Sequence, residues 1–137
     1  MKSKQIPVLI VCMLLISCEL IRLTEHKKLT IKPDPEQSIG SVFLLIQEVK
    51  DSNFVGASKL FVPTDSIVDL DHLFELREKI ERFGRKIAKR EVTAYKIDTL
   101  NLKEHLVWIE FDYLYEYFFV TQRNDNWWLI KNFWEKK

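Results

Sequence analysis

Three acidic side chains lie among tyrosines in the C-terminal half of the chain, at Glu110, Asp112 and Glu116. A carboxylate in an aromatic pocket can have a raised pKa and act as a general base. In an extended strand alternate residues share a face, so Glu110 and Asp112 would point away from the neighbouring apolar residues and toward solvent. Trp108 shares this acidic register and keeps both interpretations open. Solvent exposure is the simpler interpretation, and we name no catalytic residue.

The three histidines show no spacing typical of a metal site. His26, His72 and His105 fall on separate predicted elements, and no two of them are four residues apart, as a helical pair of ligands would be. The chain has only three glycines and no glycine-rich phosphate loop. We therefore predict no metal ion and no cofactor.

A cysteine near the N-terminus follows a short hydrophobic segment. Lys2 and Lys4 precede an apolar run over residues 6–16, and Ser17 comes directly before Cys18. A basic start, a short apolar run and a small residue at its end are typical of a secretory signal peptide. The run falls well short of the roughly 20 residues that span a bilayer. Residues 1–17 are therefore expected to be a signal peptide that is removed.

The end of this segment, Leu15-Ile16-Ser17-Cys18, resembles the lipobox of bacterial lipoproteins. The resemblance implies that Cys18 carries acyl chains and becomes the first residue of the mature protein. Two acyl chains suffice for stable anchoring. The protein would then lie at the cell membrane or outer membrane, with its domain in the periplasm or outside the cell. Polar residues 18–35 are expected to form the lipidated cysteine and a tether, and Cys12 would leave with the signal.

The charge of the expected mature chain is nearly balanced. Removing the two lysines of the signal leaves 19 basic side chains beside 20 acidic ones. A nucleic-acid-binding domain would need a clustered basic surface. The locally basic residues 82–90 have acidic neighbours and fit a solvated helix end. We therefore expect no nucleic-acid partner.

The pattern of residues 36–137 predicts one α+β domain, with two main N-terminal helices packed on a curved antiparallel sheet of about four strands. Apolar residues at helical spacing predict a helix from about 36 to 50, with Asp34 as its cap, and a second over 70–83 that stops at Gly84. A single helical turn is expected over 57–61.

The strands are expected at 91–99, 104–112, 114–122 and 127–134, with turns near 101–104 and 124–126. The break between the middle two strands contains no Gly or Pro, so a hairpin and one long bent strand both remain open.

Eleven of the 17 aromatic residues lie between Trp108 and Trp134. Alternation places Trp127 with Phe133 on one face of the last strand and Trp128 with Trp134 on the other. One interpretation is that the rings fill a core, and the other is that some form a binding surface or a dimer interface. The candidates for ligand or partner binding are Tyr113, Tyr115, Tyr117, Trp127, Trp128 and Trp134.

Helices followed by a sheet that ends in Asn126-Trp127-Trp128-Leu129-Ile130 resemble the NTF2-like (cystatin-like α+β) group. Residues 83–90 and 119–127 are similar to segments of small bacterial members, although Asn126 stands where a glycine is usual. The resemblance implies a cone formed by helices and a curved sheet. It transfers no catalytic residue, because members bind small molecules, catalyse isomerisation or dehydration, or mediate protein contacts.

These observations favour a non-catalytic lipoprotein that binds a protein or an apolar ligand through an aromatic sheet face. Two alternatives are an immunity protein that neutralises a toxin, a role implied by the NTF2-like resemblance, and a small pocket enzyme of the same group. The expected partners are the membrane, through Cys18, and a protein partner or a second copy of the chain.

Overall fold

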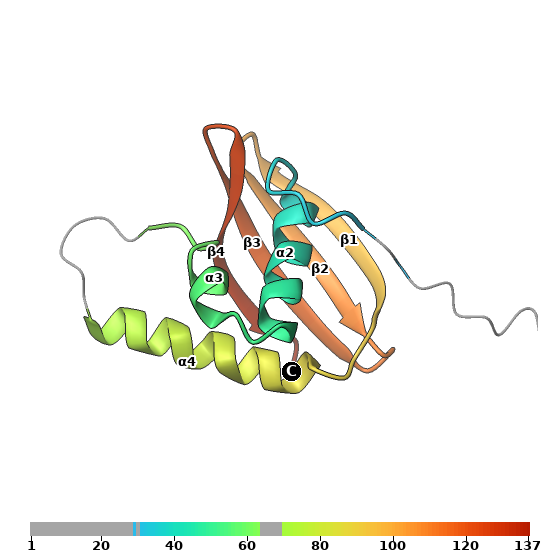
Figure 1. Cartoon of the computed structure of the whole chain (residues 1–137). Helices are drawn as coiled ribbons and strands as arrows, with labels where there is room; N and C mark the ends of the chain where they lie inside the picture. The colour runs from blue at the N-terminus through green and yellow to red at the C-terminus, as the bar shows by residue number, and fades with distance from the viewer. Residues whose placement is uncertain (1–28, 30, 64–69) are drawn as a thin grey trace, which may run out of the picture.

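The computed structural model describes residues 29, 31–63 and 70–137 (Figure 1). The expected signal peptide, Cys18 and His26 lie outside the described residues, as does most of the expected tether. The elements in chain order are α2 (Ser38–Lys50), α3 (Phe54–Ser58), α4 (Leu70–Ile87), β1 (Val92–Asn101), β2 (Glu104–Phe111), β3 (Tyr115–Asn124) and β4 (Trp127–Glu135).

The fold is α+β, with one antiparallel sheet in the order β1-β2-β3-β4. This confirms the expected class and number of strands. The helices span residues 38–87 and therefore lie in the middle of the chain rather than at its start. They lie together on one face of the sheet, and no helix of the described chain covers the other face (Figure 1). The sheet therefore has an inner face toward the helices and an outer face toward solvent.

The link between β2 and β3 is a tight hairpin turn over residues 112–114, so the alternative of one long bent strand is wrong. Asp112 and Tyr113 have φ angles of 52° and 58°, and the Leu114 N–H donates to the Phe111 carbonyl at 3.0 Å. Two consecutive residues with positive φ match the twist of adjacent antiparallel strands. This turn contains no glycine or proline, so the usual turn residues did not predict it.

Helix α2 begins at Ser38, later than expected, and Asp34 does not cap it. The Asp34 carboxylate accepts from the Glu36 N–H at 3.0 Å and so caps a preceding turn. The Pro35 carbonyl accepts from the Trp128 N–H at 2.7 Å. Because this carbonyl is bonded to the sheet, the chain enters the helix only after residue 37.

Helix α4 passes through Gly84 and ends at Ile87, so the expected stop at Gly84 is wrong. A Cβ atom at Gly84 would lie 3.2 Å from the Phe54 ring and 3.3 Å from the Val49 side chain. This glycine therefore lets the helices pack closely.

The first turns of α4 extend past the sheet (Figure 1), which leaves Leu70, Leu73 and Phe74 exposed although the pattern placed them on a buried stripe.

The short helix is also displaced from its expected range of 57–61. Asn53 caps α3 by accepting from the Gly56 N–H at 3.1 Å. The chain then runs beside β4, where the Ile130 N–H donates to the Leu60 carbonyl and the Ile130 carbonyl accepts from the Val62 N–H. These bonds satisfy part of the outer edge of β4.

The inner face of the sheet carries the core. Phe83 of α4 contacts four rings, with centroid distances of 4.9 Å to Tyr117, 5.3 Å to Phe133, 5.8 Å to Phe119 and 6.2 Å to Phe111. Tilted and edge-to-face contacts at these distances are favourable. All five rings are buried, so they form the centre of the packing between the helices and the sheet.

Gly40 provides a test of how α2 is seated. A Cβ atom there would lie 2.1 Å from the Asp34 carbonyl oxygen. Alanine is favoured over glycine in a helix by about 1 kcal/mol, yet we expect Gly40→Ala to lower the free energy of unfolding by about 1–3 kcal/mol through this clash. Denaturant unfolding of a soluble form measures the change, with exposed Gln47→Ala as the control. A stabilised Gly40→Ala variant would contradict this packing.

Candidate binding face of the sheet

A β-bulge in β4 decides which aromatic side chains reach the outer face. Val120 pairs with Asn132 and Thr121 pairs with Ile130, so Lys131 is an extra residue in β4. An extra residue reverses the alternation of the side chains that follow it. The expected pairing of Trp127 with Phe133 on one face, and of Trp128 with Trp134 on the other, is therefore wrong.

The bulge places Phe133 in the core and Trp134 outside. Phe133 is 2% exposed and stacks on Phe119 with a centroid distance of 5.6 Å. Trp134 is 43% exposed and stacks on Phe118 at 5.7 Å, with the ring planes 19° apart. Trp127 is 57% exposed and precedes the bulge on the outer side. Both exposed tryptophans of β4 thus lie on the same face.

We use the name outer face for the exposed and half-buried apolar side chains of β2, β3 and β4 that point away from the helices. Cross-strand register pairs Trp108 with Phe118 and Leu106 with Val120. Such directly opposed side chains contact one another on one face of a sheet. The outer face consists of Leu106, Trp108, Phe118, Val120, Trp127, Leu129 and Trp134.

Ionised side chains border the outer face. Glu116 accepts from the Trp108 indole N–H at 2.8 Å and from the Lys136 amine at 2.7 Å. The hydrogen bond from Lys136, followed by that from Trp108, holds the pKa of Glu116 below its ordinary value. A general base in an apolar pocket would show the opposite shift. Glu116 is therefore a charged border residue that orients Trp108.

The other two acids of the expected constellation have their own partners, although Glu110 lies directly opposite Glu116 in the register of β2 and β3. Glu110 accepts from the Thr93 hydroxyl at 2.9 Å, and Asp112 pairs with Arg90 at 3.2 Å beside the β2–β3 turn. The structure therefore sets Glu110 opposite Glu116, with Asp112 in the adjoining turn, and gives each carboxylate its own polar partner.

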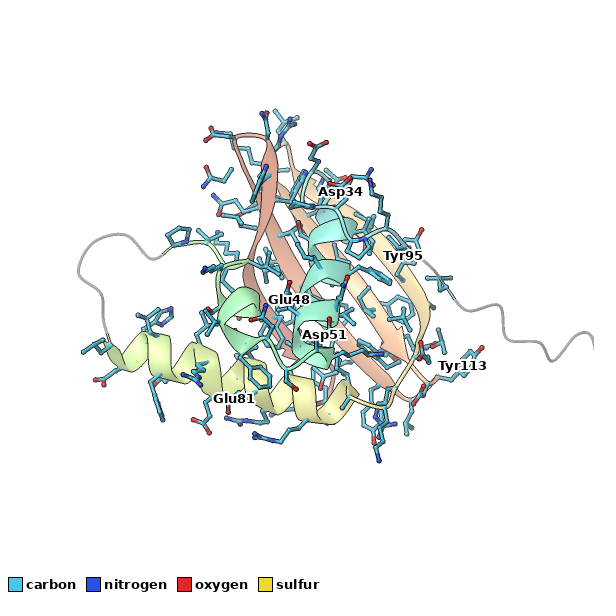
Figure 2. The ribbon with its side chains drawn as sticks, viewed as in Figure 1. Asp34, Glu48, Asp51, Glu81, Tyr95 and Tyr113 are labelled. Carbon is cyan, nitrogen blue, oxygen red and sulfur yellow. The ribbon has the colours of Figure 1, made fainter. Side chains whose placement is uncertain are left out.

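The six aromatic residues proposed from the sequence divide into separate environments. Trp127 and Trp134 lie on the outer face, while Tyr117 and Trp128 are 4% and 8% exposed in the interior. Tyr113 projects from the β2–β3 turn, away from the body of the domain (Figure 2). Only two of the six thus share the outer face, at opposite ends of β4.

The sixth candidate, Tyr115, is covered by basic side chains. The Arg90 guanidinium lies 4.0 Å and the Lys86 amine 4.9 Å from its ring centroid. Such cation–π contacts hold the ring against the end of α4. Tyr115 therefore lies on the inner side of the sheet, away from the outer face.

Trp108, Phe118 and the aliphatic residues beside them were not among the candidates. Their signal was the second register of β2 and β3, in which Trp108 alternates with Glu110, and Phe118 with Glu116. Acidic neighbours made this register resemble an ordinary solvated face. The apolar character of this face becomes clear only from the pairing with β4, which places Trp134 opposite Phe118.

A contact between Ser38 and His105 also escaped the sequence analysis. The Ser38 hydroxyl lies 2.8 Å from His105 Nδ1, and the His105 ring stacks on Trp128 at 4.2 Å. A serine beside a histidine can act as a nucleophile. Ser38, however, is only 5% exposed, and Ser41 nearby donates to the Trp128 carbonyl at 2.6 Å. This cluster fastens the start of α2 to the sheet.

A shallow groove of about 550 Å³ lies between α4 and β4. Its charged side chains are largely paired, with Lys86 2.7 Å from Glu135 and Lys79 2.8 Å from Asn132. Burial, followed by the negative charge of Glu135, raises the pKa of Tyr117, whereas burial lowers the pKa of Lys79. A phenol with a raised pKa stays neutral, and the Lys79 amine is held by its hydrogen bond to Asn132.

Within the described part of the chain, no three His, Cys, Asp or Glu side chains are grouped to bind a metal ion. No helix there has the length and apolarity to span a membrane. Comparisons with protein-family models, curated proteins and solved structures found no match. The function must therefore be argued from the surface itself.

The border contact at Glu116 predicts a titration. The pKa of Glu116 should lie below the ordinary value of about 4.3, and Lys136→Gln should raise it because the closest positive charge is lost. Lys137→Gln is the matched control one residue along the chain and should leave this pKa unchanged. NMR detection of the carboxyl carbon during an acid titration measures both. Equal titration in all three proteins would contradict the contact.

Proposed function

We propose that the protein is a lipid-anchored lipoprotein of the cell envelope that binds a protein partner through the outer face and has no catalytic activity. The observation that carries this proposal is the stacked pair Phe118 and Trp134 on a sheet face that no described helix covers, with exposed Trp127 on the same face at the opposite end of β4. Tryptophan in such a setting is enriched among residues that dominate binding energy.

The distribution of charge on this face supports a protein partner. Ion pairs accompany its apolar residues: Lys136 with Glu116 at 2.7 Å and Lys96 with Asp98 at 3.0 Å lie at its borders, and Lys131 of β4 reaches across β3 to Glu104 of β2 at 2.7 Å. An apolar centre with a polar border is the usual composition of a protein interface. Small apolar ligands are instead bound in concave sites that enclose most of their surface.

The finer assignment to the NTF2-like group is part of the same proposal. It is supported by the helices packed on one face of an antiparallel sheet and by the close of that sheet at Trp127–Glu135. The aromatic cluster around Phe83 packs between the helices and the sheet, where a pocket enzyme of that group would hold its substrate, and leaves only the groove beside α4. This packing favours protein contacts over catalysis. An immunity protein is one form of the proposed function, with a toxin as the partner.

Lipid anchoring is tested by a pair of cysteine variants in the full chain. We expect Cys18→Ser to abolish both the incorporation of labelled palmitate and the removal of the signal peptide, because Cys18 is the proposed acylated residue. Cys12→Ser should retain both, since it lies within the segment that is removed. Lipid labelling and membrane fractionation measure the outcome. Labelling that persists in Cys18→Ser, or disappears in Cys12→Ser, would refute the assignment.

Partner binding is tested by photocrosslinking in cells. A photoreactive amino acid at position 127 or 134 should yield a protein adduct, whereas one at position 113 should not, because Tyr113 is an exposed aromatic residue outside the outer face. With the crosslinker at 127, Trp134→Ala should reduce the adduct strongly, since loss of a central aromatic residue costs about 2 kcal/mol or more. Equal adducts at all three positions would show that the outer face has no special role.

A further inference from the structure

The two edges of the sheet differ in how their backbone groups are satisfied. The outer edge of β4 bonds to Pro35, Leu60 and Val62. Within the described chain, the backbone hydrogen bonds of β1 go only to β2. An unpaired strand edge is a template for another strand, and natural proteins usually protect it. The free edge of β1 is therefore a candidate site for strand addition.

The central part of β1 is regular and suited to such pairing. Ala94–Thr99 pairs with β2 without interruption, and the register shifts only at the two ends of this run. Lys96 and Asp98 lie on the outer side, where they form an ion pair with each other. Tyr95 and Ile97 lie on the helix side and are 42% and 38% exposed. Both faces of β1 thus carry side chains that would lie beside those of an added strand; Figure 2 labels Tyr95.

The charges of β1 select one symmetric register for a second copy of the chain. Side chains that lie opposite one another on adjacent strands point to the same face of the sheet. In a symmetric antiparallel pair, one residue of β1 must therefore lie directly opposite the same residue of the partner subunit, and the two-fold axis passes between these two residues. An axis at residue 96 would oppose two lysines, and an axis at residue 98 would oppose two aspartates, both unfavourable. An axis at Ile97 opposes Lys96 to Asp98 of the partner subunit, twice.

We propose that two copies of this chain pair through antiparallel β1 strands about a two-fold axis at Ile97, forming a continuous eight-stranded sheet. Ile97 then opposes Ile97 of the partner subunit, and Tyr95 opposes Thr99 of the partner subunit. A lysine on an edge strand normally discourages pairing. Here Asp98 of the partner subunit lies opposite Lys96 and carries the opposite charge, so this lysine favours pairing with a second copy of the chain.

The symmetry has a consequence for binding. A two-fold axis between antiparallel edge strands runs perpendicular to the sheet, so both outer faces point in the same direction. The two sets of Trp127 and Trp134 lie at the far edges of the joined sheet, on β4. Dimerisation therefore leaves the outer face free and presents two copies of it, an arrangement that raises avidity for a repeated partner. The dimer does not depend on the proposed function of that face.

Disulfide trapping in cells tests the register directly, in a Cys12→Ser form of the full chain. Opposed residues across paired strands have Cα atoms about 4.5–5.5 Å apart, within the range that a disulfide bridges. We expect Ile97→Cys to form a disulfide-linked dimer on mild oxidation. Leu102→Cys is the control, because it is 96% exposed but would lie about 33 Å from its equivalent. Equal trapping at both positions, or none at position 97, would overturn the proposal.

Charge exchange supplies a second test that needs no cysteine at β1. Lys96→Asp or Asp98→Lys alone should weaken dimer formation about tenfold or more, because each creates two opposed like charges. The double exchange restores opposite charges and should restore the dimer. Light scattering of the full chain in detergent measures the mass. A native monomer, or a double exchange that behaves like the single variants, would exclude pairing in this register.

Discussion

The contacts of Phe83 with rings from three strands are the interaction on which the rest of the structure depends. Its ring meets Phe111 of β2, Tyr117 of β3 and Phe133 of β4. Gly84, the next residue, lets α4 approach α2 closely. A single turn of α4 therefore joins the helical layer to the sheet. These large side chains occupy the inner face, and Phe83, Tyr117 and Phe133 also line the groove between α4 and β4.

The bulge at Lys131 reconciles this core with an aromatic outer face. A regular β4 that buried Trp128 and Ile130 would have turned Trp134 inward and Phe133 outward. One extra residue reverses the alternation, so Phe133 completes the cluster around Phe83 while Trp134 stacks on Phe118. Bulges commonly redirect side chains in this way. The same local irregularity thus completes the core and assembles the surface for which we propose a binding role.

The two faces and the two edges of the sheet consequently have different roles. The inner face is packed, and the edge of β4 is satisfied by Pro35 and the segment around Leu60. The outer face and the edge of β1 are left to solvent. Binding on one and strand pairing on the other use separate residues, so the two proposals are compatible. Both follow from a one-layer sheet that has helices on a single side.

Local patterns in the sequence determined the class of fold and the succession of elements. The spacing of Ile39, Val42 and Ile46 requires a buried helical face, and the polar turn at 124–126 requires a hairpin. The sequence likewise predicts the lipid anchor at Cys18, which no described residue tests. Tertiary structure alone decided that Gly84 packs inside a helix, that Ser38 meets His105, and which tryptophans share a face. Periodicity depends on neighbours along the chain, whereas a bulge or a close helix crossing depends on residues distant in sequence.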